Sequence, residues 1–276
     1  MIVFVLKVVF APLMLAMTAL VGRRWGARVA GTLAALPVSA GTVTFFVSLE
    51  HGAQFGAETA AATLVGIGGL AWFSLGYSHL SRRFGWPVCL AAGYAIIAVS
   101  AVAVLPFEQA PGFVVLAYAV LALFVGSKLM PAARDIEPEK PPAWDIPARM
   151  ATGAILVVVL TALAGALGPQ VSGLLNAVPM LSSVLLVFSH RHEGAEHARG
   201  ILLGFVAGLV ATAIFMEIVA DGAVRLGIGP AFVLATAACL GYQVLAIRWP
   251  GRTSRTVPSE GPERRERGPA ASSKRS

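Results

Sequence analysis

Nine runs of about 20 apolar residues occupy most of this chain, and each is long enough to cross a lipid bilayer as a helix. Backbone N–H and C=O groups in hydrocarbon must pair within their own segment, so such runs fold as helices. With 57% hydrophobic and 13% charged residues, the chain has too few charges to cover a soluble globule. The sequence therefore predicts an all-α polytopic membrane protein. Its expected spans are 2–22, 27–49, 57–78, 87–106, 111–130, 147–167, 170–189, 198–220 and 229–247.

An internal duplication relates the two halves of the chain. Residues 30–52, AGTLAALPVSAGTVTFFVSLEHG, align without a gap with residues 172–194, SGLLNAVPMLSSVLLVFSHRHEG. The offset of 142 residues (179 − 37) places Pro37 on Pro179 and holds across the whole aligned stretch. A constant offset of this kind indicates that one membrane segment was copied.

The distribution of Lys and Arg predicts the orientation, because cytoplasmic loops collect positive charge. Of the 21 Lys and Arg residues, all except Lys7 and Arg225 fall on one side of the nine expected spans. The N-terminus is then outside and the C-terminus cytoplasmic. The positive charges follow the first apolar run, whereas a signal peptide carries them before it, so we expect a retained first helix. Abundant Ala and the excess of Arg over Lys suggest a bacterial inner membrane.

The duplication and the span count together predict two inverted repeats. An odd number of crossings between equivalent helices turns the second copy upside down, which is a common transporter plan. We expect a first four-helix repeat at 1–108 and a second, inverted one at 147–248. Residues 109–146 supply a joining helix and a proline-rich cytoplasmic linker. Residues 249–276 are expected to form a disordered basic tail that contacts anionic lipid.

Two prolines in equivalent spans mark the expected binding site. Each removes a backbone donor and frees the carbonyl four residues earlier, at Leu33 and at Leu175. Inverted repeats bring such broken helices to the bilayer midplane, where transporters bind substrate. The alternative is packing alone, since proline kinks and hydroxyl residues are common in membrane helices. The predicted substrate-binding residues are Pro37, Ser39, Thr42, Asn176, Pro179, Ser182 and Ser183.

Ionisable residues are absent from the middle third of every expected span, which disfavours an exporter that depends on a buried carboxylate. Glu217, near the outer end of the eighth span, is the candidate coupling acid, and a snorkelling interfacial side chain is the alternative. Lys7 and Arg149 occupy similar places in the two copies. They would either attract an anionic headgroup or anchor their helices at the interface.

Residues 190–197 contain three histidines and raise a metal hypothesis. Zinc proteases place two histidines four residues apart on one helix, with a glutamate between them. Here His192 and His197 are one residue further apart and Gly194 interrupts the segment, so we interpret it as a solvated cytoplasmic loop without metal. The chain also lacks a Gly-x-Ser-x-Gly motif and a phosphate-binding loop, which indicates neither an enzyme nor a cofactor. Membrane orientation explains the basic residues better than nucleic-acid binding does.

The repeated segment with Gly31, Pro37 and Gly52 in one copy, and Gly173, Pro179 and Gly194 in the other, resembles the small inner-membrane proteins of the GlpM type. Those are similar to single-copy members of the drug/metabolite transporter group. The inverted-repeat plan predicts a secondary transporter that moves a small neutral or weakly polar metabolite, or a lipid-linked solute, by alternating access. A fused arrangement of four, one and four helices would resemble the two-halved members of the drug/metabolite transporter group. The GlpM-type resemblance also allows a non-transporting accessory protein of envelope or polysaccharide assembly. Substrate, coupling ion, direction and oligomeric state, a homodimer included, stay open.

Overall fold

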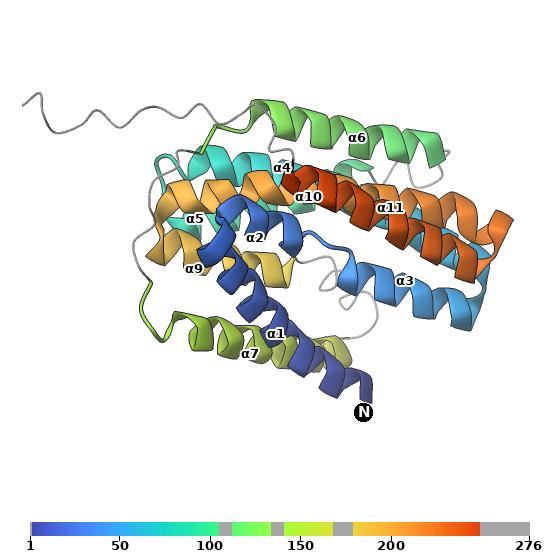
Figure 1. Cartoon of the computed structure of the whole chain (residues 1–276), viewed down its shortest axis with the longest axis horizontal. Helices are drawn as coiled ribbons and strands as arrows, with labels where there is room; N and C mark the ends of the chain where they lie inside the picture. The colour runs from blue at the N-terminus through green and yellow to red at the C-terminus, as the bar shows by residue number, and fades with distance from the viewer. Residues whose placement is uncertain (1, 105–111, 134–140, 168–178, 249–276) are drawn as a thin grey trace, which may run out of the picture.

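The computed structural model describes residues 2–104, 112–133, 141–167 and 179–248 (Figure 1). Within these ranges the chain is helical and contains no strand. The helices are α1 (Ile2–Trp25), α2 (Ala27–Ala34), α3 (Val38–His51), α4 (Ala53–Leu80), α5 (Trp86–Val104), α6 (Gly112–Leu129), α7 (Asp145–Leu167), α9 (Met180–His192), α10 (Gly194–Leu226) and α11 (Ile228–Arg248). The predicted tail 249–276 and part of the predicted linker lie outside the described residues.

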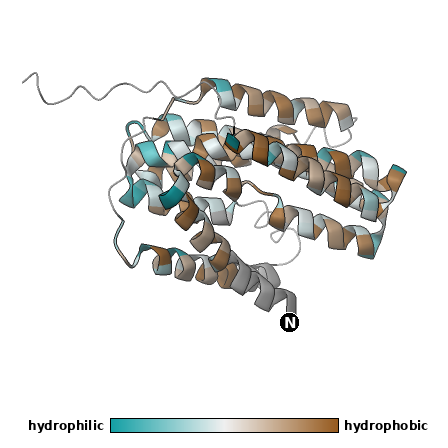
Figure 2. Cartoon of the chain, viewed as in Figure 1, coloured by the Kyte–Doolittle hydropathy of each residue, from teal (hydrophilic) through white to brown (hydrophobic). Residues whose placement is uncertain are grey.

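Five of the described helices are long and apolar enough to cross a membrane, namely α4, α5, α6, α10 and α11. They differ in how far they are enclosed by protein, since 67% of the apolar window of α10 is buried but only 11% of that of α5. Large apolar side chains such as Phe113 on α6 and Val233 on α11 face outward. Outward apolar surface on long helices is what a lipid environment requires, so the protein is embedded in a membrane. Figure 2 shows that the hydrophobic colour predominates along α6 and α11.

The helices recur at the offset of the sequence duplication. Their bounds match in three places on the two copies, at the ends of α1 and α7 (Trp25, Leu167), at the starts of α3 and α9 (Val38, Met180) and at the starts of α5 and α11 (Trp86, Ile228). The helix pairing recurs as well, because α3 packs on α4 as α9 packs on α10, and α4 packs on α5 as α10 packs on α11. The two aligned parts of the chain therefore share these three helix boundaries and these two helix pairings.

Two pairs of packed helices, α1 with α7 and α4 with α10, run in opposite directions. Arg23, in the last turn of α1, donates a hydrogen bond of 2.8 Å to Asp145, the first residue of α7. Tyr77, near the end of α4, bonds at 2.9 Å to His190, which lies just before the start of α10. Since the end of one helix meets the start of the other in each case, α1 is antiparallel to α7 and α4 is antiparallel to α10.

A close crossing of α2 and α10 joins the two copies at the core. Gly31 of α2 lies against the carbonyl of Ile201, and Gly204 of α10 lies against the carbonyl of Arg28. A Cβ atom at either glycine would collide with that backbone oxygen. Small residues allow membrane helices to approach to backbone contact, so this crossing depends on glycine at both positions.

One end of the bundle gathers most of the described cations, and we call it the basic end. It lies on the left in Figures 1 and 2, where the hydrophilic colour is concentrated. Figure 1 shows there the ends of α1, α4, α6 and α9 and the starts of α2, α7 and α10, and the Arg23–Asp145 and Tyr77–His190 bonds agree for α1, α7, α4 and α9. The cations there are Arg23, Arg24, Arg28, Arg82, Arg83, Lys128, Arg149, Arg191 and Arg199.

Candidate functional site

The second apolar run is broken where the sequence predicts, at Pro37. Helix α2 ends at Ala34, and Pro37 occupies the N-cap position of α3 with φ −76° and ψ 37°. The Leu33 carbonyl, which the proline leaves without its usual helical donor, accepts a 3.1 Å hydrogen bond from the Leu36 N–H. A tight turn therefore satisfies this carbonyl without help from water.

Side chains of the second copy complete the junction between α2 and α3. The Thr212 hydroxyl on α10 donates to the Ala35 carbonyl at 2.5 Å, and Gln243 Nε2 on α11 donates to the Thr32 carbonyl at 3.1 Å. Both donors are buried, and the Oε1 atom of Gln243 has no partner among the described residues. Sequence analysis missed both. The signal was available, because a buried Gln or Thr in an apolar span needs a hydrogen-bond partner.

The predicted substrate-binding residues have different surroundings in the structure. Thr42 is exposed and bonds to the Val38 carbonyl of its own helix at 2.6 Å. Ser183 is buried, and its hydroxyl lies 2.6 Å from that of Tyr94 on α5. Pro179 is half-buried at the N-cap of α9, and Ser182 is half-buried on that helix. Asn176 and the side chain of Ser39 lie outside the described residues, as does the chain that leads into Pro179 from 168 to 178.

The candidate coupling acid Glu217 is half-buried on α10. Asp221, one turn further on, forms an exposed ion pair of 2.9 Å with Arg225. Because α10 starts at the basic end and runs from Gly194 to Leu226, Glu217 in its last third lies towards the opposite end of the bundle.

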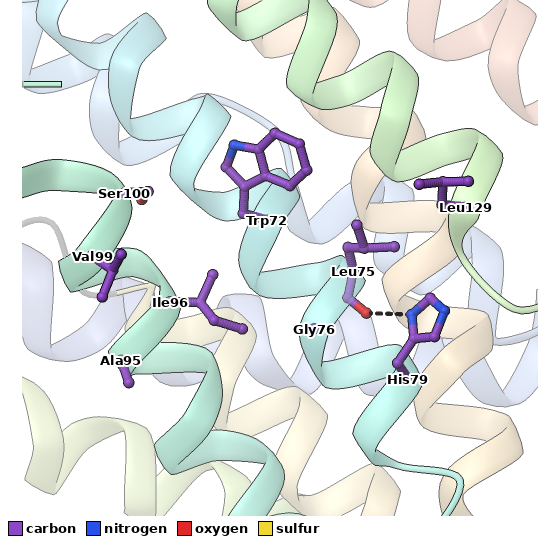
Figure 3. Close-up of a pocket in the computed structure, with 9 residues that line it drawn as sticks. All are labelled: Trp72, Leu75, Gly76, His79, Ala95, Ile96, Val99, Ser100 and Leu129. Carbon is purple, nitrogen blue, oxygen red and sulfur yellow. Dashed lines mark hydrogen bonds between the residues drawn. The ribbon is translucent and has the colours of Figure 1, made fainter. Parts of the chain in front are cut away.

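A cavity of about 650 Å³ lies between α4, α5 and α6 (Figure 3). None of the predicted substrate-binding residues lines it. Its walls are almost entirely apolar, and exposed residues such as Val99 and Leu129 place its mouth on the outer surface of the bundle. The lining residues are Trp72, Leu75, Gly76, His79, Ala95, Ile96, Val99, Ser100 and Leu129.

A buried ionic network centred on Asp145 lies at the basic end. The Asp145 carboxylate has no exposed area and accepts hydrogen bonds from Arg23 at 2.8 Å, from Arg149 Nε at 2.9 Å and from His192 at 2.8 Å. Arg149 is 1% exposed and also donates to the Ser189 hydroxyl at 3.1 Å. Buried charges are tolerated only when they are paired in this way. The network therefore links α1, α7 and α9 through hydrogen bonds between buried charged side chains.

The start of α10 joins the same network through Glu193. This carboxylate lies 3.6 Å from Arg149 and 3.2 Å from the His197 ring, and Arg199 pairs with Glu196 one turn later. Among the described residues, no group of three or more His, Cys, Asp or Glu side chains is arranged to hold a metal ion.

The local charges set the protonation of the network. Burial acts to raise the pKa of Asp145, but the bonds from His192, Arg149 and Arg23 and the charge of Arg149 hold that pKa below its ordinary value. Burial lowers the pKa of His190, and the positive charge of Arg199 acts in the same direction. The carboxylate of Asp145 is therefore ionised and the ring of His190 is neutral at pH 7.

The interpretation of residues 190–197 as a solvated loop was wrong. His190 and His192 lie in the last turn of α9, His197 lies in the first turns of α10, and His190 is 9% exposed. The physical reason is the network, which satisfies polar side chains that sequence reasoning had assigned to water. Asp145 and Arg149, four residues apart at the start of an apolar helix, were the signal that could have located it.

Comparison of the chain with family models, with curated proteins and with solved structures returns no match. The resemblance to GlpM-type proteins consequently stays a prediction made from the repeated glycines and prolines.

Proposed function

We propose that this protein is a secondary transporter of a small neutral or weakly polar metabolite, or of a lipid-linked solute, that works by alternating access. The observation that carries the proposal is the junction at Pro37. The second expected span is interrupted there between α2 and α3, and the carbonyls of Ala35 and Thr32 accept hydrogen bonds from Thr212 and Gln243 in the second half of the chain. Interrupted helices at the contact between two copies are the usual substrate-binding element of carriers with inverted repeats.

The proposed architecture has nine crossings, with two inverted four-helix repeats joined by α6. Its support is the antiparallel packing of α1 on α7 and of α4 on α10, which inversion requires of equivalent helices. The concentration of cations at the basic end supports a cytoplasmic location for that end. We therefore propose that the N-terminus is outside the inner membrane and the C-terminus in the cytoplasm.

Closure of the basic end is the second element of the proposed mechanism. The ionic network links α1, α7 and α9 through Arg23, Arg149 and His192, which all bond to Asp145. The Asp145 carboxylate at its centre is not exposed to solvent. Rocking of one copy against the other would separate Arg23 from Asp145, because Arg23 is on α1 of the first copy and Asp145 begins α7, which leads into the second. We infer that this pair acts as the inner gate, closed in the conformation described here.

Single cysteines test the inverted topology. Gly52 and Gly194 are poor sites for them, because their φ values of 96° and 90° strain any other residue. His51→Cys and Arg191→Cys are suitable instead, since both positions are exposed. In a background with Cys89→Ala and Cys239→Ala, an impermeant maleimide added to intact cells should label His51→Cys only, and Arg191→Cys should react only after permeabilisation. Equal labelling of both in intact cells would reject the inversion.

Transport itself is tested by profiling intracellular and extracellular solutes in cells that express the wild type, Pro37→Ala/Pro179→Ala or Pro87→Ala. Pro87 is the matched control, because it is exposed in the first turn of α5, where a missing N–H costs little. We expect at least one solute to redistribute with the wild type and with Pro87→Ala but not with the double variant. If the wild type redistributes no solute although it is present in the membrane, the accessory-protein alternative is favoured.

A further inference from the structure

The apolar cavity between α4, α5 and α6 has the shape of a groove on the membrane-facing surface. Helices α5 and α6 both pack on α4, and the groove lies between them (Figure 3). Val99 on α5 is 69% exposed and Leu129 at the end of α6 is 59% exposed, so the groove opens outward at both walls. All three helices are long and apolar enough to cross a membrane. The groove therefore opens towards lipid.

The lining offers little to a polar ligand. The Ser100 hydroxyl donates to the Ile97 carbonyl of its own helix at 2.8 Å, and His79 Nδ1 bonds to the Leu75 carbonyl at 3.0 Å. The remaining walls are hydrocarbon and the indole of Trp72. The volume of about 650 Å³ falls within the range of roughly 300–1,000 Å³ that is typical of small-molecule binding pockets. An extended hydrocarbon chain fits this environment best.

Positive charge lies where the groove meets the basic end. His79 and Leu129 line that end of the groove. Arg82 and Arg83 follow in the turn after α4, and Lys128 precedes Leu129 on α6. These three cations are exposed, and none of them forms an ion pair with a described residue. They are available to an anionic group at the level of the lipid headgroups.

We propose that the groove is a binding site for an anionic phospholipid, with one acyl chain between α5 and α6 and the phosphate on Arg82, Arg83 and Lys128. Burial of the chain supplies affinity through its methylene groups, and Arg side chains supply phosphate recognition by bidentate hydrogen bonds. The arrangement matches the basic pockets between membrane helices that hold anionic lipid headgroups. This site is separate from the electrostatic contact expected of the tail 249–276, and it is independent of transport.

The test measures binding of phosphatidylglycerol and phosphatidylcholine with identical acyl chains to the purified full-length protein in detergent, by native mass spectrometry and by the lipid-dependent rise in melting temperature. Wild type should retain phosphatidylglycerol preferentially. Arg82→Gln/Arg83→Gln should bind phosphatidylglycerol at least about tenfold more weakly, because two headgroup charges are lost. Arg24→Gln, at an exposed cation of the same end on α1, should bind as the wild type does.

The groove itself is tested by filling it. Val99→Trp should abolish retention of both lipids, whereas Val102→Trp, one turn further along α5 and equally exposed to lipid but not lining the groove, should leave it unchanged. The pair shares one substitution on one helix, so a general effect of tryptophan would appear in both. Equal binding of the two lipids would overturn the headgroup assignment. Unaltered binding by Val99→Trp would overturn the groove as the site.

Discussion

Two ion pairs of the same local design lie at opposite ends of the bundle. Asp145 and Arg149 at the basic end, and Asp221 and Arg225 at the other end, are each an aspartate and an arginine four residues apart on a helix, and each pair is joined at 2.9 Å. Their exposure differs completely. The first pair is 0% and 1% exposed, whereas the second is 56% and 73% exposed.

The difference comes from what surrounds each pair. Asp145 also accepts bonds from Arg23 of α1 and His192 of α9, so its charge is shared among three helices. Asp221 is bonded within one helix, where water and salt screen the pair. The same spacing thus gives a buried ion pair that holds three helices together at one end and an exposed ion pair that contributes little to stability at the other.

Among these substitutions, removal of the Asp145 side chain should lower the free energy of unfolding most. Asp145→Ala leaves Arg149 buried without its nearest carboxylate and releases Arg23 and His192, so we expect a loss of about 3–5 kcal/mol in the free energy of unfolding. Chemical denaturation of the detergent-solubilised protein, followed by tryptophan fluorescence, measures it. A loss below about 1 kcal/mol would show that the network does not hold the basic end together.

Acid should weaken the same network. The pKa of Asp145 is held below its ordinary value in the folded protein. Its stabilisation is therefore fully present above the unfolded pKa, about 3.9, and is lost as pH falls through the folded value. The stability difference between the wild type and Asp145→Asn, measured by denaturation across pH, should be constant near neutral pH and shrink below about pH 4. A stability difference between the two proteins that grew towards acid pH would contradict a lowered pKa of Asp145 in the folded protein.

A smaller effect is expected from His192→Phe. The phenyl ring can keep the edge contacts that His192 makes with Trp144 and Phe188, but it removes the 2.8 Å bond to Asp145. Loss of one hydrogen bond to a charged group should cost about 1.5–3 kcal/mol by the same denaturation measurement. A cost equal to that of Asp145→Ala would mean that His192, rather than Arg149, is the main partner.

Asp221→Ala should have the smallest effect. Exposed pairs of this spacing contribute about 0.3–0.5 kcal/mol, so the free energy of unfolding should change by no more than about 0.5 kcal/mol. That small difference should vanish at 1 M salt, where the Debye length is about 3 Å. A cost near that of Asp145→Ala would break the comparison between the two ends.

Several parts of the fold could be predicted from local sequence. Apolar runs located the five membrane helices, because helix formation in lipid depends on a segment's own length and composition. The break at Pro37 was predicted as well, since a missing N–H acts on its own helix.

The candidate site was less accessible to sequence reasoning. Thr212 and Gln243 lie far from Thr32 and Ala35 in the chain, and no local pattern pairs them. The same holds for Ser183, which was chosen for its place beside Pro179 but whose nearest described partner is Tyr94 of the first copy.

Chain composition and hydropathy were sufficient for the class of protein and for the positions of the five membrane helices, because each is a property of neighbouring residues. Only the tertiary structure decided which polar groups are buried, which carbonyls they satisfy and where a groove remains open between helices. Burial and hydrogen bonding depend on residues from different helices meeting at one point. Asp145 and Asp221 demonstrate this, since the spacing to their arginines is the same and their surroundings are not.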